Sequence, residues 1–203
     1  MSRRNGRDRG QAHTLEAFTA AMLLLASIVF ALQVTAVTPL TASTSSQHIE
    51  NQQAGVARGL LASAVANDSL KPAVLYWNDS RGAFHGTSSR GYYANGGPSN
   101  TTFGRMLNRT FRDRGIAVDV NVYYLTSGDT RRQQEMVNFG EPSDNAVGVR
   151  QMVTLYDNDT LYEPGGIKGD TTVSEASGFY ADDIAPDSPV YNVLVVEVVV
   201  WRM

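Results

Sequence analysis

Hydrophobic and polar residues divide the chain into one long apolar stretch followed by shorter periodic segments. Residues 17–37 contain no charged side chain. At about 1.5 Å per residue, a helix of this length spans roughly 30 Å, the thickness of the hydrocarbon core of a bilayer. Its few polar residues are hydroxyls and one amide, and hydroxyls in helices can bond to the carbonyls of their own helix. The pattern predicts a membrane-spanning helix rather than a buried helix of a globular core.

A second helical stretch follows the apolar one. Pro39 is expected to kink or interrupt the helix just beyond the apolar stretch. Helical periodicity resumes from about residue 44 to residue 66, with one apolar face formed by Ile49, Val56, Leu60 and Ala64. We expect this face to pack on a globular domain.

The remaining segments alternate between strand patterns and one further helix. Apolar residues at helical spacing (Phe103, Met106, Leu107 and Phe111) predict a helix that ends at Gly115. Strands are predicted over residues 73–77, 116–126, 132–139, 149–157 and 190–201. The last of these is apolar on both faces except at Glu197, which predicts a central strand covered on both sides. The fold class is therefore α+β: a long N-terminal transmembrane helix followed by an antiparallel β-sheet head with one additional short helix.

Charge distinguishes the two flanks of the apolar stretch. The net formal charge is −3, but residues 1–10 carry four arginines and one aspartate and the remainder is acidic. Basic residues on the N-terminal side place that side in the cytoplasm and the rest of the chain outside the cell membrane, as a single-pass protein. An acidic remainder also argues against a nucleic-acid partner.

Three interpretations of the N-terminal segment remain open: a removed secretory signal, a plain membrane anchor, or a segment that is cut and kept. Val34-Thr35-Ala36 could serve as a signal-peptidase site. Glu16, at the edge of the apolar stretch, argues against a removed signal of either the ordinary or the twin-arginine kind, because a carboxylate at the membrane boundary costs free energy unless it has a partner or a use. Ser2-Arg3-Arg4 is a poor twin-arginine signal, since Asn5 and Gly6 follow the pair.

Arg9-Gly10-Gln11, followed by Glu16 and Phe18, resembles the class III signal peptide of archaeal type IV pilins and related pilin-like proteins. The chain as a whole resembles, more loosely, haloarchaeal pilin-like membrane proteins. The resemblance implies cleavage by a prepilin peptidase between Gly10 and Gln11, retention of the apolar helix, and a role for Glu16 in registering subunits within a filament. Glu16 stands sixth after that cut, where the family usually has it fifth, and cutting after Gln11 would restore the spacing.

Five Asn-x-Ser/Thr sequons are more than composition predicts by chance, which suggests N-glycosylation of an exported domain. The candidate sites are Asn67, Asn78, Asn100, Asn108 and Asn158. Asn67 and Asn108 are predicted at or in helices, whereas the other three fall in or beside predicted turns. An Asn- and Thr-rich surface composition is the alternative explanation.

Catalytic and metal-binding patterns are weak. The chain has no cysteine, and its three histidines are scattered along the sequence. Asp157, Asp159 and Glu163 resemble oxygen ligands for calcium, but an acidic turn is the simpler interpretation, and Asp182, Asp183 and Asp187 are treated in the same way. We expect no enzyme, no cofactor, no metal site and no small-molecule substrate.

The sequence therefore predicts a pilin-like structural subunit, possibly a minor one, of an archaeal surface filament or secretion-type assembly. The expected partners are membrane lipid, the prepilin peptidase and other pilin-like subunits. The expected organisation is a cytoplasmic basic leader at 1–10, a transmembrane or filament-core helix at 11–38, an amphipathic stalk helix at 39–67 and an extracytoplasmic head at 68–203. The alternative is a single-pass protein that holds an extracellular binding or adhesion domain outside any filament.

Overall fold

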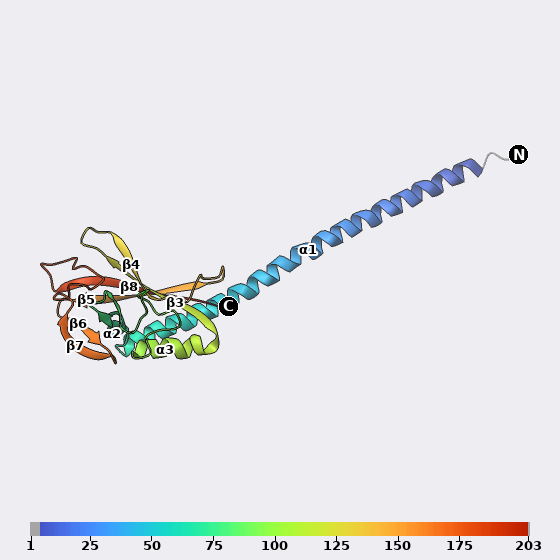
Figure 1. The fold of residues 1–203 in the computed structure, drawn as a ribbon. Helices are drawn as coiled ribbons and strands as arrows, with labels where there is room; N and C mark the ends of the chain where they lie inside the picture. Colours follow the sequence, from blue (N-terminus) through green and yellow to red (C-terminus); the bar gives the residue numbers. More distant parts are fainter. Residues whose placement is uncertain (1–4, 203) are drawn as a thin grey trace. The chain divides into compact units, whose positions relative to one another are not determined.

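The protein is described by a computed structural model that covers the backbone of residues 5–202 and the side chains of residues 13–33 and 47–202. The chain divides into two compact units, Met1–His48 and Ile49–Met203, which we call the N-terminal unit and the C-terminal unit. The N-terminal unit is helical, and the C-terminal unit combines helices with antiparallel sheets (Figure 1). The fold class is therefore α+β, with an apolar helix at its N-terminal side.

Helix α1 spans Asn5–Ala66 and so extends from the N-terminal unit into the C-terminal unit. Its backbone stays helical across Pro39, so the predicted interruption there is not found. Near its end one face is buried, formed by Gln53, Ala54, Ala57, Leu60, Leu61 and Ala64. Burial of Leu60 and Ala64 confirms half of the predicted face. Ile49 and Val56 are 38% and 40% exposed, because the buried stripe is rotated towards the small alanines, which allow close approach to the sheet.

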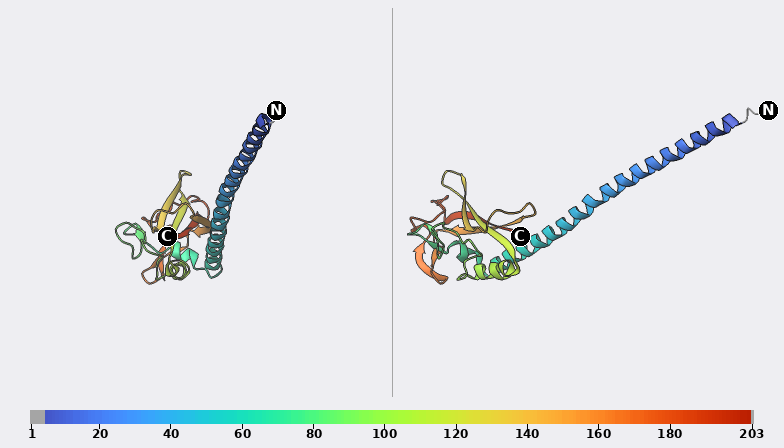
Figure 2. Two further views of the ribbon diagram at one scale, coloured as in Figure 1. Left: turned by 90° about the vertical axis from the view of Figure 1, so that its right-hand side faces the viewer. Right: turned by 45° about the vertical axis from the view of Figure 1, so that its right-hand side comes forward.

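A four-stranded antiparallel sheet forms the centre of the C-terminal unit, in the order β4-β3-β8-β5. Figure 2 shows this unit from two further directions. The strands are β3 (Ile116–Leu125), β4 (Arg131–Val137), β5 (Val147–Tyr156) and β8 (Val190–Arg202). Strand β8 pairs with both β3 and β5, which confirms its predicted central place. Its second face is only partly covered, since Val193 is 36% exposed, so the prediction of cover on both sides was wrong.

Helix α3 (Thr102–Thr110) buries Phe103 and Leu107 completely, as its spacing predicts. The hydroxyl of Thr101 accepts a hydrogen bond from the backbone N–H of Gly104 and caps the helix start. A 3₁₀ turn, η1 (Arg112–Arg114), then leads to Gly115, whose φ of 69° is the left-handed conformation that glycine adopts readily at helix ends.

The strand predicted at residues 73–77 was largely wrong. Leu70–Val74 forms the short helix α2, and strand β1 covers only Trp77–Asn78, paired with β2 (Ala83–Phe84). A third small sheet pairs β6 (Thr160–Glu163) with β7 (Ile167–Thr172). The apolar residues of this region still reach the core, because the Trp77 ring packs edge-on against Phe84 at 5.0 Å between ring centroids.

Candidate functional site

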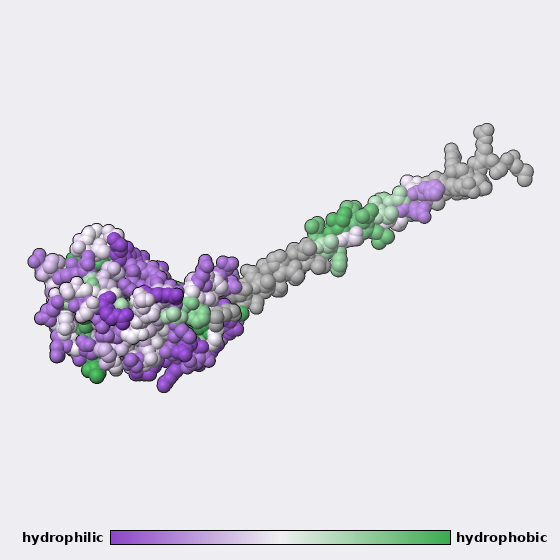
Figure 3. Space-filling view, in the orientation of Figure 1, coloured by the Kyte–Doolittle hydropathy of each residue, from purple (hydrophilic) through white to green (hydrophobic). Residues whose placement is uncertain are grey.

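The apolar part of helix α1 is the first candidate functional element. Residues 13–33 have a mean hydropathy of 2.2, and none of this stretch is buried within the structure. Leu23 is 72% exposed and Phe30 is 69% exposed. In the part of the chain whose side chains are described, this is the one helix long and apolar enough to cross a membrane. Figure 3 shows this apolar surface in green, whereas the visible surface of the C-terminal unit is mainly hydrophilic.

Polar side chains within this stretch bond mainly to their own helix. The hydroxyl of Thr19 donates to the carbonyls of Leu15 and Glu16, both at 3.0 Å, and the hydroxyl of Ser27 donates to the carbonyl of Leu24 at 2.8 Å. These bonds confirm that the hydroxyls can be accommodated in an apolar environment, because they leave no donor unsatisfied.

Glu16 is the acidic residue of this helix stretch, and its side chain is 81% exposed. The Nδ1 atom of His13 lies 3.6 Å from its Oε2 atom, a geometry that gives an ion pair only when the imidazole is protonated. The proposed cleavage residues Gly10 and Gln11 lie in the range of α1, but their side chains fall outside the described residues.

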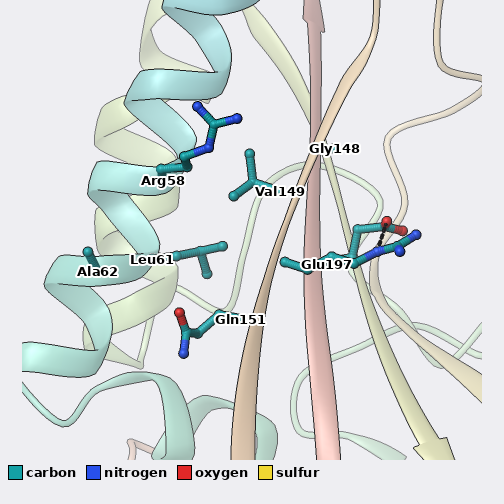
Figure 4. Close-up of a pocket in the computed structure, with 8 residues that line it drawn as sticks. Arg58, Leu61, Ala62, Gly148, Val149, Gln151 and Glu197 are labelled. Carbon is teal, nitrogen blue, oxygen red and sulfur yellow. Dashed lines mark hydrogen bonds and ion pairs between the residues drawn. The ribbon is translucent and has the colours of Figure 1, made fainter.

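A second candidate is the groove between the end of α1 and strand β5, within the C-terminal unit. Its volume is about 730 Å³. Figure 4 shows Leu61 of α1 and Val149 of β5 facing each other across the groove, while Glu197 lies on the far side of β5. The exposed Arg58 lies at the helix side of the groove. The groove thus follows the unpaired edge of β5.

Glu197, the one acidic residue of β8, is held in place by two partners on the partly covered sheet face. The Nε atom of Arg150 donates to its Oε1 atom at 2.7 Å, and the hydroxyl of Tyr123 donates to its Oε2 atom at 2.8 Å. Burial, and then the hydrogen bond to Glu197, raise the pKa of Tyr123. Paired in this way, an acid that is only 8% exposed satisfies its charge in a largely apolar strand.

The same sheet face carries an apolar groove of about 480 Å³, lined by Tyr123, Arg131, Met152, Val193 and Val195 among others. The guanidinium of Arg131 lies over the ring of Tyr123, 4.1 Å from its centroid. No sequence pattern indicates that arginines from β4 and β5 meet at Tyr123, since strand register is not visible in a single sequence.

Asp119 is a buried acid of β3. Apolar and polar residues alternate along the start of this strand in the sequence, which predicts that Asp119 lies on the polar face, yet it is only 7% exposed. The backbone N–H of Phe139 donates to its Oδ1 atom at 2.6 Å. Burial raises the pKa of this carboxyl, and the N–H groups of Phe139 and Gly140 act in the opposite direction. The acid is therefore a structural anchor for the chain that leaves β4.

The acidic turns do not come together as a metal site. Among the described residues, no group of three or more His, Asp or Glu side chains could hold a metal ion. Asp159 instead pairs with Lys71 at 2.8 Å and accepts the backbone N–H of Tyr156 at 2.8 Å.

The five sequon asparagines differ in their surroundings. Asn158 is exposed, and no hydrogen bond to its side chain occurs within residues 47–202. Asn67 and Asn100 are also exposed, and their amides contact Met106 Sδ and the Tyr76 hydroxyl, each at 3.5 Å. The Oδ1 atom of Asn78 accepts the N–H of Arg81, and Asn108 bonds both the N–H and the carbonyl of Gly97.

These features define an α+β protein whose described residues include one apolar N-terminal helix that could span a membrane. The chain belongs to a family of unknown function (DUF7288), which matches residues 9–200. No curated protein and no solved structure matches the chain significantly. The matched region includes both the apolar helix and the sheets of the C-terminal unit, so the two are parts of one family architecture.

Proposed function

We propose that this protein is a pilin-like structural subunit, held in the cell membrane by its N-terminal helix with the C-terminal unit outside, that assembles with other such subunits. The observation that carries the proposal is the uncovered apolar surface of residues 13–33. Side chains such as Leu23 and Phe30 have no cover from residues 13–33 and 47–202, so a bilayer before assembly and neighbouring helices after assembly would supply it. Basic residues before this stretch support the orientation.

Glu16 supports assembly rather than simple anchoring. Glu16 lies well inside α1, which begins at Asn5, so without a partner its carboxylate contributes less than the roughly 0.3–1 kcal/mol of an acid in the first turn of a helix. If it pairs with the N-terminal amine of a neighbouring subunit away from water, loss of its charge costs roughly 3–5 kcal/mol. Its exposure within the isolated chain leaves it available for such a partner.

The N-terminal sequence of protein extracted from native membranes tests processing. A mature chain that begins at Gln11 or Ala12 is expected, and Gly10→Leu should leave the full-length precursor in the membrane. An intact mass that includes Met1 or Ser2 in the wild-type protein would contradict the pilin-like assignment and leave the anchored domain.

Assembly is tested by Glu16→Gln. This variant should be inserted and cleaved like the wild type, yet be lost from sheared surface material and from membrane complexes. Glu141→Gln, at an exposed acid of the C-terminal unit, is the matched control and should assemble normally. Equal assembly of both variants would remove the registering role of Glu16.

The second candidate is a single-pass protein that presents a binding domain without forming filaments. It is favoured by the apolar groove beside Tyr123 and Met152, an uncovered surface on an otherwise hydrophilic domain. The processing and assembly experiments separate the two candidates, because an anchor keeps residues 1–10 and does not need Glu16.

A further inference from the structure

A polar cavity of about 250 Å³ lies among the loops of the C-terminal unit, and we call it the loop cavity. It is lined by the ends of the β1–β2 hairpin, by the glycine-rich segment 95–100 and by residues of α3 and η1. It is distinct from both grooves described above, with which it shares no lining residue. Its volume is below the roughly 300–1,000 Å³ of sites for drug-sized molecules, so a ligand must be small.

The wall of the cavity is fixed before any ligand arrives. The Asn108 side chain accepts the N–H of Gly97 at 2.9 Å and donates to its carbonyl at 3.3 Å. A Cβ atom at Gly104 would lie 2.0 Å from the carbonyl oxygen of Pro98, so the loop rests directly on the helix. A preformed site loses less entropy on binding than a loop that must become ordered.

His85 supplies an unused polar side chain inside this wall. The residue is only 8% exposed, and its ring lies 5.0 Å from the ring of Tyr76. The main chain of His85 is bonded, with its carbonyl accepting the Tyr93 hydroxyl, but neither ring nitrogen has a hydrogen-bond partner within residues 47–202. The ring nitrogens of His85 are therefore available in this cavity to donate to or accept from a bound hydroxyl group.

Charge selects the kind of ligand. Arg112 is the charged side chain in the lining, and none of the lining residues is acidic. The aliphatic part of Arg112 lies across Gly96, where a Cβ atom would come within 2.9 Å of its Cδ atom. A guanidinium at the rim of a polar cavity favours a carboxylate, which it can bind through two parallel hydrogen bonds.

We propose that the loop cavity binds one sugar-acid ring, a hexuronic acid that is either free or at the end of a glycan. The carboxylate would pair with Arg112, ring hydroxyls would bond to His85, and the apolar face of the sugar would lie against the half-buried ring of Tyr93. This ligand goes beyond the proposed structural role and does not depend on it.

The experiment is a calorimetric titration of the full chain in detergent micelles with glucuronate, glucose and acetate. Saturable binding of glucuronate is expected, with glucose at least about tenfold weaker and acetate weaker still, since charge and hydroxyls are both needed. Arg112→Gln should lower the affinity for glucuronate to that for glucose. Arg109→Gln, an exposed arginine of α3 outside the cavity, should bind as the wild type does.

His85→Phe, which keeps an aromatic ring but removes both ring nitrogens, should weaken glucuronate and glucose alike. If the His85→Phe variant does not fold, the comparison of Arg112→Gln with Arg109→Gln still tests the proposal. Methyl glucuronide distinguishes the sources: equal binding assigns the site to a glycan end, and binding of the free acid alone assigns it to a soluble ligand, both of which sustain the proposal. No saturable binding of glucuronate, or unchanged binding by Arg112→Gln, overturns it.

Discussion

Helix α1 contributes apolar side chains to both units of the molecule, and these side chains differ in their exposure to solvent. In residues 13–33 leucines and phenylalanines are more than half exposed, whereas in the C-terminal unit Leu60 and Leu61 of the same helix are 6% and 2% exposed. The C-terminal unit provides its own cover, in the form of the antiparallel sheet. The N-terminal stretch has no comparable cover among the residues whose side chains are described. The free energy of unfolding of the C-terminal unit and the membrane association of residues 13–33 should therefore respond to different substitutions.

The largest expected effect is the loss of stability of the C-terminal unit when a residue of its core is truncated. Phe103→Ala removes a completely buried ring from α3 and should lower the free energy of unfolding of the C-terminal unit by about 3–5 kcal/mol. Urea unfolding followed by fluorescence of Trp77 and Trp201 measures this. Membrane association of the protein in cell fractions should not change, and a parallel loss of both properties would show that the units depend on each other.

A substitution in the apolar stretch should have the opposite pattern. Leu23→Arg puts a charge near the centre of residues 13–33, at a cost of about 2.5–3.5 kcal/mol for insertion into a bilayer. Carbonate extraction of membranes should release this variant, while urea unfolding of the C-terminal unit stays as in the wild type. Val56→Arg, on an exposed face of the same helix in the C-terminal unit, is the control and should remain in the membrane.

Alkaline pH should act on the C-terminal unit alone. Burial, and then nearby acids led by Asp183, raise the pKa of Tyr191 from 10.0 to about 12. Above pH 10 the unfolded chain loses this proton and the folded chain keeps it, so unfolding becomes more favourable until about pH 12. Burial also raises the pKa of Tyr93 and Tyr180, so the loss of stability should be large.

Urea unfolding at several pH values between 9 and 12 checks this slope. Tyr191→Phe should be less stable at pH 9, because its hydroxyl donates to the carbonyl of Ala181 at 2.8 Å, but its stability should fall less steeply with pH. Residues 13–33 contain no tyrosine, so membrane association should persist over the same range.

The smallest effect concerns modification of the surface. Asn158 is exposed in the turn between β5 and β6, whereas Asn108 uses its amide to hold Gly97. Peptide mass spectrometry of native material should therefore find glycan at Asn158 and an unmodified Asn108. Asn158→Gln should shift the mass of the protein with little change in the free energy of unfolding. Glycan at Asn108 with a bare Asn158 would contradict this ranking.

Sequence periodicity predicted the elements whose apolar positions face one large core. Helix α3 and strands β3 and β8 were correct for this reason, since a period of 3.6 or 2 repeats over enough residues to be distinctive. It failed at residues 73–77, where a short apolar run fits a helical turn as well as a strand. It also misplaced the buried stripe of α1, because hydrophobicity favours Val56 over Ala57 while close packing favours the smaller residue.

The sequence predicted the candidate sites that are local in the chain, but not those that are assembled from distant segments. Glu16 and the apolar stretch are local features, so the sequence contains them in full. The loop cavity joins His85, Gly97 and Arg112 from separate segments, and the arginines around Tyr123 come from β4 and β5. Such groups depend on loop conformation and strand register, which no local pattern encodes.

Strand β8 is central in the sheet but is the last described strand to be synthesised, which affects when the sheet can form. Strands β3 and β5 leave the ribosome before the strand that joins them, since β8 follows every other described strand in the sequence. Until β8 emerges, β3 has only β4 as a partner and β5 has none in its sheet. Pairing of distant segments is slow because a long loop must close first. The sheet is therefore expected to form late, after the apolar helix has been made, so the chain can cross a membrane before its largest sheet closes.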